Sequence, residues 1–585
     1  MRETVRLTVE REVAVPMRDG TVLYADVYRP AAAGRYPVIL LRTPYNKAFA
    51  RIAYLQLDPM RAAARGYALV IQDTRGRYAS GGEFYCFRAE ADDGYDTVEW
   101  AAAAPWADGN VGMYGASYMG ATQWLAALAR PPHLRCLVPI VTASDYHEGW
   151  TYQGGAFSLG FNLSWTLSSL ILPNLAHLAL PSGEADRVRA ALVEAVDRMC
   201  GPLGHLPLGE LPLLRDRRLA PYYQDWLAHP DDDDYWRAWN IEGRHGEVTV
   251  PALNVGGWYD IFLGGTLRNY LGMRARGGSP AARQSRLIVG PWVHSTLFPN
   301  VSGEVDFGVL SQGVALDLEG IMLRWFDHWL RDIDTGLLAE PPVKLFVMGE
   351  NRWRDEADWP PPAMRPVAYY LHSGGRANSL AGDGRLGVDP PREEPPDHYL
   401  YDPRDPVPTR GGGLCCWPAA VPPGAYDQRP VEARPDVLLY STPPLAEATE
   451  LTGPVTVRLW AASSAPDTDF TAKLVDVAPD GYARNLTDGI IRARYRATTR
   501  AATPIEPGRV YEYAIDLWAT SNVFPAGHRI RLEVSSSNFP RFDRNANTGR
   551  AFGTDAELRP ALQTVCHDSA RASHVVLPVV PRGGA

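Results

Sequence analysis

Over the first 145 residues, short apolar runs alternate with segments of helical periodicity. Residues 91–100 carry carboxylates in their first turn, as helices do, and residues 1–11 alternate charged with apolar side chains, as strands do. Four apolar runs are typical of buried strands: residues 37–43, 67–73, 111–114 and 134–141. This alternation predicts a sheet covered by helices.

The pattern changes after residue 145 and returns about a hundred residues later. Aromatic and glycine residues crowd positions 146–165, and residues 184–196 follow with helical periodicity. Strand-like runs reappear at 248–255 and 286–290, and residues 316–330 predict a closing helix. We therefore expect a discontinuous α/β domain with a helical cap inserted in it.

Proline-rich segments at 360–362 and 390–396 end the α/β pattern. Beyond them, alternating runs separated by turn residues predict the strands 455–460, 471–476, 490–495, 511–516 and 529–534. Such runs are typical of an antiparallel sandwich or jelly roll. The predicted organisation is 1–145 for the first part of the α/β domain, 146–247 for the cap, 248–352 for the second part and 353–585 for a β domain.

Composition indicates an ordinary globular protein. The 585 residues are 46% hydrophobic and 21% charged with a formal charge of −9, and no basic run suggests nucleic acid. No apolar stretch is long enough to span a membrane or to act as a secretory signal, so we expect a cytoplasmic protein. The six cysteines show neither CxxC spacing nor a zinc-type cluster, which predicts buried free thiols, no metal and no cofactor.

The most specific local motif surrounds Ser117. Residues 112–120 read GMYGASYMG, follow the strand 111–114 and open a helical segment that continues through Leu128. A strand, a tight turn, a serine and a helix form a nucleophile elbow, which exposes the hydroxyl and turns backbone N–H groups toward a developing oxyanion. Gly115 and Gly120 supply small residues, but the usual G-x-S-x-G pattern places glycine where this chain has Met119. Without the flanking strand and helix, a plain turn would be the simpler interpretation.

A nucleophilic serine needs an imidazole to accept its proton and a carboxylate to orient that imidazole. The chain order on this fold is Ser, Asp, His. Asp260 follows the predicted strand ending at Val255, and His294 follows the predicted strand ending at Val289. Both lie in loops at one edge of a parallel sheet, which predicts the triad Ser117, Asp260, His294.

Other candidates fit this order less well. His133 and His328 do not follow a strand end, and His147 precedes every plausible triad aspartate. Asp73 ends a strand but precedes Ser117, and with Arg75 nearby we interpret it as half of a structural ion pair.

An oxyanion hole needs two hydrogen-bond donors. The N–H of Tyr118, directly after the nucleophile, is the expected first donor. The loop 43–47 should supply the second, and because it lacks a glycine run we expect a side-chain donor, the Tyr45 hydroxyl. The alternative is that Tyr45 is a packing aromatic.

With these motifs placed, the chain resembles the bacterial cocaine esterase / X-Pro dipeptidyl-peptidase family (CocE/NonD hydrolases). The resemblance covers nearly the whole chain. It is carried by MRDG at 17–20, TPY at 43–45, IQDTRG at 71–76, DGNVGM at 108–113, GASYMG at 115–120, GWYD at 257–260, GPWVH at 290–294, and by residues 467–476 and 534–540.

The resemblance implies an α/β-hydrolase domain with an inserted helical cap, followed by an all-β jelly roll. It also implies the triad named above and an oxyanion hole from Tyr45 and the Tyr118 amide. The pocket residues that it implies are Trp150 and Trp165 of the cap, Phe262 beside the triad aspartate, and the loop that contains Cys415 and Cys416. Those cysteines stand where the family has bulky apolar residues, and residues 146–155 differ too, so the chemistry transfers but the specificity does not.

The sequence therefore predicts a serine carboxylic-ester hydrolase that acts through an acyl-enzyme on small, including aromatic, acyl esters. An X-Pro dipeptidyl-peptidase or α-amino acid ester hydrolase is the alternative, with Asp145 and Glu148 as candidate carboxylates for the substrate ammonium group. A carbohydrate-binding protein acting through the jelly roll is a further alternative. We expect a small-molecule ester or amide substrate, no nucleic-acid or membrane partner, and leave a homodimer open.

Overall fold

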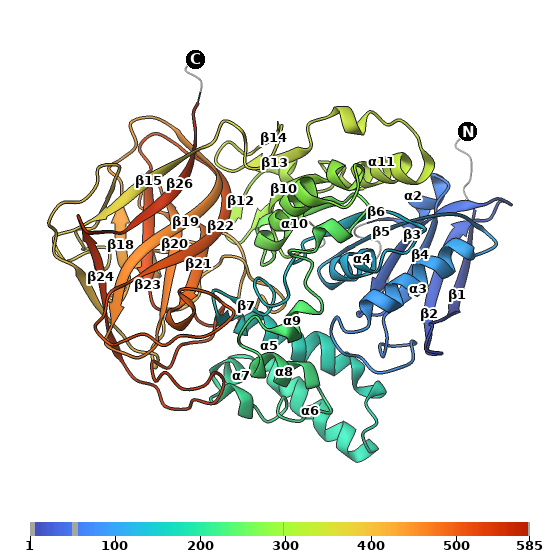
Figure 1. The fold of residues 1–585 in the computed structure, drawn as a ribbon, viewed down its shortest axis with the longest axis horizontal. Coiled ribbons are helices and arrows are strands. Elements are labelled where there is room, and N and C mark those ends of the chain that lie inside the picture. Colours follow the sequence, from blue (N-terminus) through green and yellow to red (C-terminus); the bar gives the residue numbers. More distant parts are fainter. Residues whose placement is uncertain (1–5, 50–56, 296–297, 583–585) are drawn as a thin grey trace.

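The computed structural model describes residues 6–49, 57–295 and 298–582. Three bodies are visible in Figure 1: an α/β body at the right that contains the N-terminus, a helical cap below it (α5 to α9), and a β-rich body at the left that carries the C-terminus. The α/β-hydrolase type of fold and the C-terminal β-rich domain agree with the sequence prediction.

The α/β body is built on a ten-stranded mixed sheet with the order β1-β2-β4-β3-β5-β6-β9-β10-β13-β14. Strands β4 to β13 along this order run parallel, whereas β1, β2 and β14 pair antiparallel at the two edges. The bounds are β1 Leu7–Pro16, β2 Val22–Pro30, β3 Tyr36–Thr43, β4 Ala68–Asp73, β5 Ala107–Ala116, β6 Leu134–Ile140, β9 Leu253–Tyr259, β10 Arg286–Val293, β13 Val343–Val347 and β14 Arg352–Glu356. The sheet thus reaches Glu356, beyond the boundary expected at 352.

Helices cover both faces of this sheet. One face packs against α3, α4 and α10, and the other against α2 and α11, so that the central strands are buried on both sides. The bounds are α2 Pro59–Ala64, α3 Glu90–Ala103, α4 Tyr118–Ala129, α10 Leu263–Arg276 and α11 Leu318–Arg331. The helices predicted at 91–100 and 316–330 correspond to α3 and α11.

Strands β9 and β10 differ from the sequence prediction. Residues 248–252, expected in a strand, precede β9, while both strands run on through glycines that were interpreted as loop. Glycine is needed at these strand positions because Trp292 packs tightly against them. A Cβ on Gly257 would lie 2.3 Å from the Trp292 carbonyl oxygen, and one on Gly290 would lie 2.4 Å from the indole. These glycines serve close packing rather than a turn.

The cap lies between β6 and β9. Aromatic side chains fill it, and they belong to the same apolar cluster as the face of the sheet under α3 and α4. Its elements are β7 Tyr152–Gln153, β8 Ala156–Phe157, α5 Leu159–Trp165, the π-helix η1 Thr166–Ile171, η2 Leu172–His177, α6 Ser182–Asp197, α7 Cys200–Gly204, η3 Leu208–Glu210, α8 Pro221–Ala228 and α9 Asp234–Arg237. The helix predicted at 184–196 is α6.

The C-terminal body is built mainly of antiparallel strands, with one parallel pairing between β16 and β18. Its sheet has the order β17-β24-β19-β26-β15-β16-β18-β23-β20-β21, with β22 paired to β19 and β25 to β24. The bounds are β15 Arg365–His372, β16 Arg385–Gly387, β17 Asp397–Tyr401, β18 Leu438–Ser441, β19 Thr449–Ser463, β20 Asp469–Val477, β21 Ala483–Arg492, β22 Tyr511–Phe524, β23 Arg529–Ser535, β24 Ala561–Asp568, β25 Arg571–Ala572 and β26 His574–Val580. The strand predicted at 490–495 ends instead at Arg492, and a 3₁₀ turn, Ala493–Tyr495, follows.

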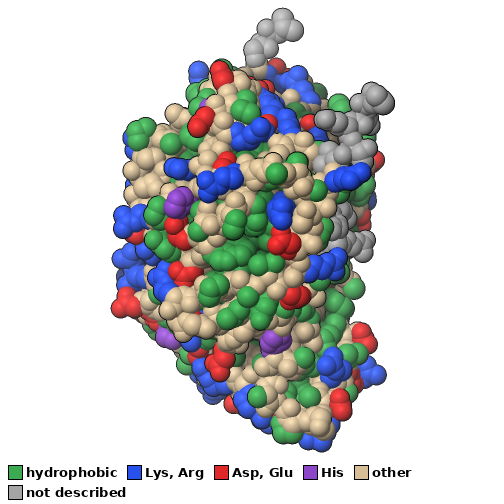
Figure 2. All heavy atoms as spheres, turned by 90° about the vertical axis from the view of Figure 1, so that its right-hand side faces the viewer, with side chains coloured by type: hydrophobic (Ala, Val, Ile, Leu, Met, Phe, Trp, Pro, Cys, Tyr) green, Lys and Arg blue, Asp and Glu red, His purple; other side chains and the backbone are tan. Residues whose placement is uncertain are grey.

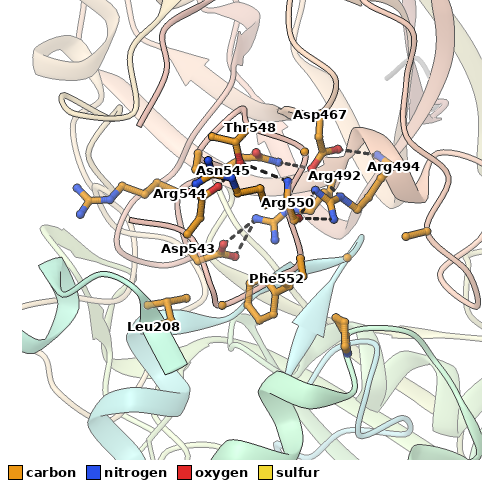
Figure 3. A pocket seen from close by; sticks show the side chains of 18 of the residues that line it. Leu208, Asp467, Arg492, Arg494, Asp543, Arg544, Asn545, Thr548, Arg550 and Phe552 are labelled. Atoms are coloured by element: carbon orange, nitrogen blue, oxygen red, sulfur yellow. Dashed lines mark hydrogen bonds and ion pairs between the residues drawn. The ribbon is translucent and has the colours of Figure 1, made fainter. Parts of the chain in front are cut away.

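The β-rich body joins the cap around a pocket of about 230 Å³. Figure 3 shows its charged side chains, with Leu208 of the cap on the opposite side. Arg492 is buried and pairs with Asp469 at 2.9 Å and with Asp543 at 2.8 Å. Asp543 in turn accepts a hydrogen bond from the backbone N–H of Phe157 in the cap at 2.7 Å. This chain of contacts connects the two bodies.

Charges of both signs are interspersed on the face of the molecule shown in Figure 2, where apolar side chains gather near the centre. That face therefore carries no extended patch of a single sign. Among the residues that the structure describes, no helix is long and apolar enough to cross a membrane.

We predict that Arg492→Ala lowers the free energy of unfolding by about 3–5 kcal/mol, because Asp469 and Asp543 would stay buried without their cation. Urea unfolding measures this loss. Arg198→Ala is the control, since it breaks an exposed pair with Glu194 and should leave the urea midpoint nearly unchanged. Equal shifts for the two variants would contradict the prediction.

Candidate active site

Ser117 occupies a strained turn between β5 and α4. Its backbone has φ 60° and ψ −125°, and α4 begins at the next residue. Gly115 has φ +140°, and a Cβ there would lie 2.6 Å from the Cβ of Met119; a Cβ on Gly120 would lie 2.7 Å from Thr142. The close approaches of this elbow therefore fall on Gly115 and Gly120. Position 119 has room for a buried methionine, which explains the departure from G-x-S-x-G.

His294 lies within hydrogen-bonding distance of both Ser117 and Asp260, the other two residues of the predicted triad. His294 Nε2 is 3.1 Å from Ser117 Oγ, and His294 Nδ1 is 2.7 Å from Asp260 Oδ2. Asp260 is buried and accepts the backbone N–H of Phe262 on its other oxygen at 2.6 Å. With Nδ1–H directed to the carboxylate, Nε2 is the atom that can accept the serine proton.

Tyr45 lies beside the serine at the end of β3. Its hydroxyl is within hydrogen-bonding reach of Ser117 and accepts a hydrogen bond from Trp165 Nε1 at 2.9 Å. Burial raises the pKa of Tyr45 above its ordinary value, so the phenol stays a neutral O–H donor. Because the Trp165 N–H supplies one hydrogen bond to the phenol oxygen, the phenol proton is available for an oxyanion.

The backbone N–H of Tyr118, and not its side chain, is the group that can donate a hydrogen bond next to Ser117. As the first residue of α4, its N–H has no partner four residues earlier in the helix. Its hydroxyl accepts the N–H of Phe87 at 2.9 Å and donates to Glu90 at 3.0 Å, which anchors the ring away from Ser117. The Tyr118 N–H and the Tyr45 hydroxyl are thus two donors of the kind that stabilise an oxyanion next to a serine.

Aromatic rings form a wall next to His294. Phe262 meets the His294 ring edge-on with centroids 5.1 Å apart, and Trp150 stacks on Phe262 at 4.4 Å. Trp165 lies 5.5 Å from Trp150 and stacks on Phe161 at 5.4 Å. The structure brings Trp150, Trp165 and Phe262 together as the resemblance implied. Phe161 is not among the pocket residues predicted from the sequence, although it lies one helical turn before Trp165 in the predicted cap.

The loop that contains Cys415 and Cys416 comes from the β-rich body and lies against the triad loop. A Cβ on Gly413 would be 3.1 Å from the backbone oxygen of Asp260. The expectation of free thiols was wrong for this pair, since Cys415 and Cys416 form a disulfide between adjacent residues, with Cys416 at φ +79°. Spacing rules based on CxxC do not detect such a pair. Of the other cysteines, Cys200 is exposed.

The carboxylates of Asp145 and Glu148 accept hydrogen bonds from other groups of the chain. Asp145 accepts the N–H groups of His147 and Glu148 on one oxygen and the Asn240 amide at 2.7 Å on the other. Glu148 accepts the N–H of Gly154 at 3.1 Å. Burial raises the pKa of each carboxyl to about 7. These contacts hold the start of the cap in place.

The predicted ion pair between Asp73 and Arg75 is wrong, since each residue has other partners. Asp73 accepts the backbone N–H of Lys47 at 2.6 Å and lies 3.6 Å from its ammonium group, whereas Arg75 pairs with Asp93 at 2.6 Å and with Asp19. The side chain of Arg75 turns from the strand end toward α3.

In the described part of the chain, no three His, Cys, Asp or Glu side chains form a group that could hold a metal ion.

Comparison with known families agrees with this geometry. Residues 19–296 match the X-Pro dipeptidyl-peptidase (S15 family), and residues 335–576 match the X-Pro dipeptidyl-peptidase C-terminal non-catalytic domain. Together the two matches span both the α/β body and the β-rich body.

Individual relatives extend over nearly the whole chain. A cocaine esterase from Rhodococcus sp. (strain MB1 Bresler) is 42% identical and aligns over 98% of this chain and 99% of its own length. A putative serine esterase from Mycobacterium tuberculosis (strain CDC 1551 / Oshkosh) is 27% identical over 90% of each chain. Two solved structures at 25% identity also match: an aminopeptidase from a marine sediment Thaumarchaeota archaeon, with TM-score 0.79 and 99% of both chains covered, and an α-amino acid ester hydrolase, with TM-score 0.78 and 99% and 97% covered.

Because burial raises the pKa of Tyr45, its hydroxyl should remain protonated where an ordinary tyrosine, with a pKa of about 10, begins to ionise. We predict that kcat for hydrolysis of a p-nitrophenyl ester stays level from about pH 8.5 to about pH 10. Initial rates corrected for spontaneous hydrolysis measure this. A fall centred near pH 10 that disappears in Tyr45→Phe would show that the phenol titrates normally.

Proposed function

This chain belongs to the X-Pro dipeptidyl-peptidase (S15) family, and from that premise we propose that it is a serine hydrolase that cleaves small carboxylic esters through an acyl-enzyme. One observation carries the proposal: the His294 imidazole bridges Ser117 and Asp260 at 3.1 and 2.7 Å, beside the neutral hydroxyl of Tyr45. This arrangement has a nucleophile, a base, an orienting carboxylate and a donor for the oxyanion.

In acylation, Ser117 Oγ attacks the ester carbonyl carbon while His294 Nε2 takes the hydroxyl proton. The carbonyl oxygen becomes negative and accepts hydrogen bonds from the Tyr45 hydroxyl and the Tyr118 N–H. The imidazolium then gives its proton to the leaving alkoxide as the carbon–oxygen bond breaks. Asp260 stabilises the imidazolium and stays ionised throughout.

In deacylation, His294 takes a proton from water, and the resulting hydroxide attacks the acyl carbon. The second tetrahedral oxyanion uses the same two donors. Its collapse breaks the bond to Ser117 Oγ, which recovers its proton from His294 and releases the carboxylic acid. Atoms and charge balance over the cycle, with water as the only co-reactant.

The surroundings of the triad favour an uncharged acyl group. Phe262 packs against His294, Trp150 stacks on Phe262, and Trp165 contacts the Tyr45 hydroxyl. Such aromatic surroundings suit small aliphatic or aromatic acyl groups. The Rhodococcus relative is a cocaine esterase, but in this chain the loop beside Asp260 carries the Cys415–Cys416 disulfide where the family has bulky apolar residues, so cocaine is not proposed as a substrate.

An X-Pro dipeptidyl-peptidase or α-amino acid ester hydrolase is the second candidate, favoured by the S15 match and by the likeness to a solved α-amino acid ester hydrolase. Both activities act on substrates with an ammonium group, which needs a carboxylate partner in a buried site. Asp145 and Glu148 already accept hydrogen bonds from backbone N–H groups. We therefore place this candidate below the plain esterase.

We further propose that the β-rich body is a jelly roll. Support comes from its antiparallel pairing, in which β19 pairs with β22, β24 and β26, and β20 pairs with β21 and β23. Two-layer packing of such strands around one core is typical of a jelly roll. Its loops contribute to the active site through residues near Cys415.

The two enzyme candidates differ in how they treat an α-ammonium group. We predict that phenyl butyrate is hydrolysed with a kcat/KM at least about tenfold above that of phenyl 2-aminobutyrate, which has the same carbon chain with an ammonium group on its α-carbon. Ser117→Ala is the control and should reduce both rates to background. A preference for the amino ester, together with release of p-nitroaniline from Ala-Pro-p-nitroanilide at a comparable rate, would favour the second candidate.

A further inference from the structure

Arg77 is a buried cation behind the oxyanion donor. It follows β4, its side chain is fully buried, and its guanidinium lies over the face of Phe84 at 4.9 Å. Among the described residues it forms no ion pair with a carboxylate; it donates hydrogen bonds to backbone carbonyls and also contacts the side chain of Tyr78. A buried charge without a counter-ion is costly, so a fold that keeps one uses the charge or its hydrogen bonds.

The first of these hydrogen bonds reaches the loop that carries Tyr45. Arg77 Nε donates to the carbonyl oxygen of Pro44 at 2.7 Å, immediately before Tyr45. This contact sets the position of the peptide from which the Tyr45 side chain extends. The guanidinium charge is also close enough to lower the pKa of Tyr45 in part, although burial outweighs it.

The other hydrogen bonds reach the cap. Arg77 Nη1 donates to Leu170 at 2.6 Å and Nη2 donates to Ser169 at 3.0 Å, both within the π-helix η1. A π-helical turn shifts the usual backbone register, and η1 passes directly into the 3₁₀ helix η2, so its carbonyls need partners outside the α-helical pattern. Arg77 provides those partners from the α/β body.

These contacts close a ring. Trp165, the last residue before η1, donates to the Tyr45 hydroxyl at 2.9 Å, while Arg77 holds both the backbone before Tyr45 and the π-helix after Trp165. The planar guanidinium reaches two chain segments in fixed directions, which an ammonium group does not do. The two segments that contact the phenol are thereby held by one side chain.

We propose that Arg77 is a positioning residue of the oxyanion hole, which holds the Tyr45 hydroxyl and the cap's Trp165 in register so that the phenol proton is directed at the developing oxyanion. The proposal rests on the proposed function, because it assumes that Tyr45 is an oxyanion donor. The alternative is a purely structural role, in which Arg77 only attaches the cap. The test must distinguish this role from the positioning of Tyr45.

A double-mutant cycle, with phenyl butyrate as the substrate, distinguishes the positioning role of Arg77 from the purely structural role. If Arg77 acts through Tyr45, Arg77→Met should lower kcat by about 10- to 100-fold with KM changed by less than about threefold, and should cost less than about threefold more once Tyr45→Phe has removed the donor. Arg77→Lys keeps the charge but not the fork and should fall between wild type and Arg77→Met.

Asn174→Ala is the matched control. Asn174 donates to the carbonyl oxygen of Gly76 at 3.1 Å and so joins the cap to the same loop through a hydrogen bond that involves neither Pro44 nor η1. It should leave kcat within about threefold of wild type, since Tyr45 keeps its position. Thermal unfolding of each variant shows whether the fold is intact, and if Arg77→Met does not fold, the cycle is run with Arg77→Lys and judged by the same criterion.

Two results would overturn the proposal. One is an unchanged kcat in both Arg77 variants; the other is a loss in kcat that is equally large with and without Tyr45→Phe. Failure of the proposed function gives a different result, because Ser117→Ala would then hydrolyse phenyl butyrate at the wild-type rate.

Discussion

Parallel strands end at a common edge of their sheet, and the active-site arrangement depends on this constraint. β5 ends next to Ser117, and β9 and β10, which pair with each other and lie beyond β6 in the same sheet, lead directly to Asp260 and His294. His294 can therefore meet a serine 177 positions away in the chain and an aspartate 34 positions away. The elbow at Ser117 adds strain that a buried, fully packed sheet can sustain.

The α/β body alone does not complete the site. The phenol of Tyr45 comes from that body, but its hydroxyl is held by Trp165 from the cap, and the loop beside Asp260 comes from the β-rich body. Arg77 joins the α/β body to the cap by hydrogen bonds to backbone carbonyls. Asp543, which pairs with Arg492, joins the β-rich body to the cap by accepting the backbone N–H of Phe157. The triad and the Tyr45 hydroxyl thus lie where three separately packed units meet, and their surroundings depend on how these units are held together.

Much of this could be predicted from sequence because it follows from local patterns. Strand ends indicated Asp260 and His294, the elbow indicated Ser117, and the resemblance added Tyr45 and the aromatic wall. The structure brings these side chains within contact distance. Gly257 and Gly290 misled because glycine next to a strand usually marks a turn, whereas here both make room for Trp292.

Other features depend on contacts between distant segments and leave no local signal. No local sequence feature distinguishes Arg77 from other arginines near strand ends. Its contacts with Pro44, Ser169 and Leu170 form only when the chain folds. The disulfide between Cys415 and Cys416 likewise depends on the backbone conformation of one loop. Phe161 enters the aromatic wall only because α5 packs beneath Trp150.

Covalent labelling of the nucleophile tests the central claim most directly. Treatment with phenylmethylsulfonyl fluoride, followed by peptide mapping in a mass spectrometer, identifies the residue that is modified as activity falls. We predict one sulfonyl group per chain, on the peptide that contains Ser117, with ester hydrolysis lost in proportion to labelling. Full modification of Ser117 with undiminished hydrolysis, or loss of activity with the label on another residue, would contradict it.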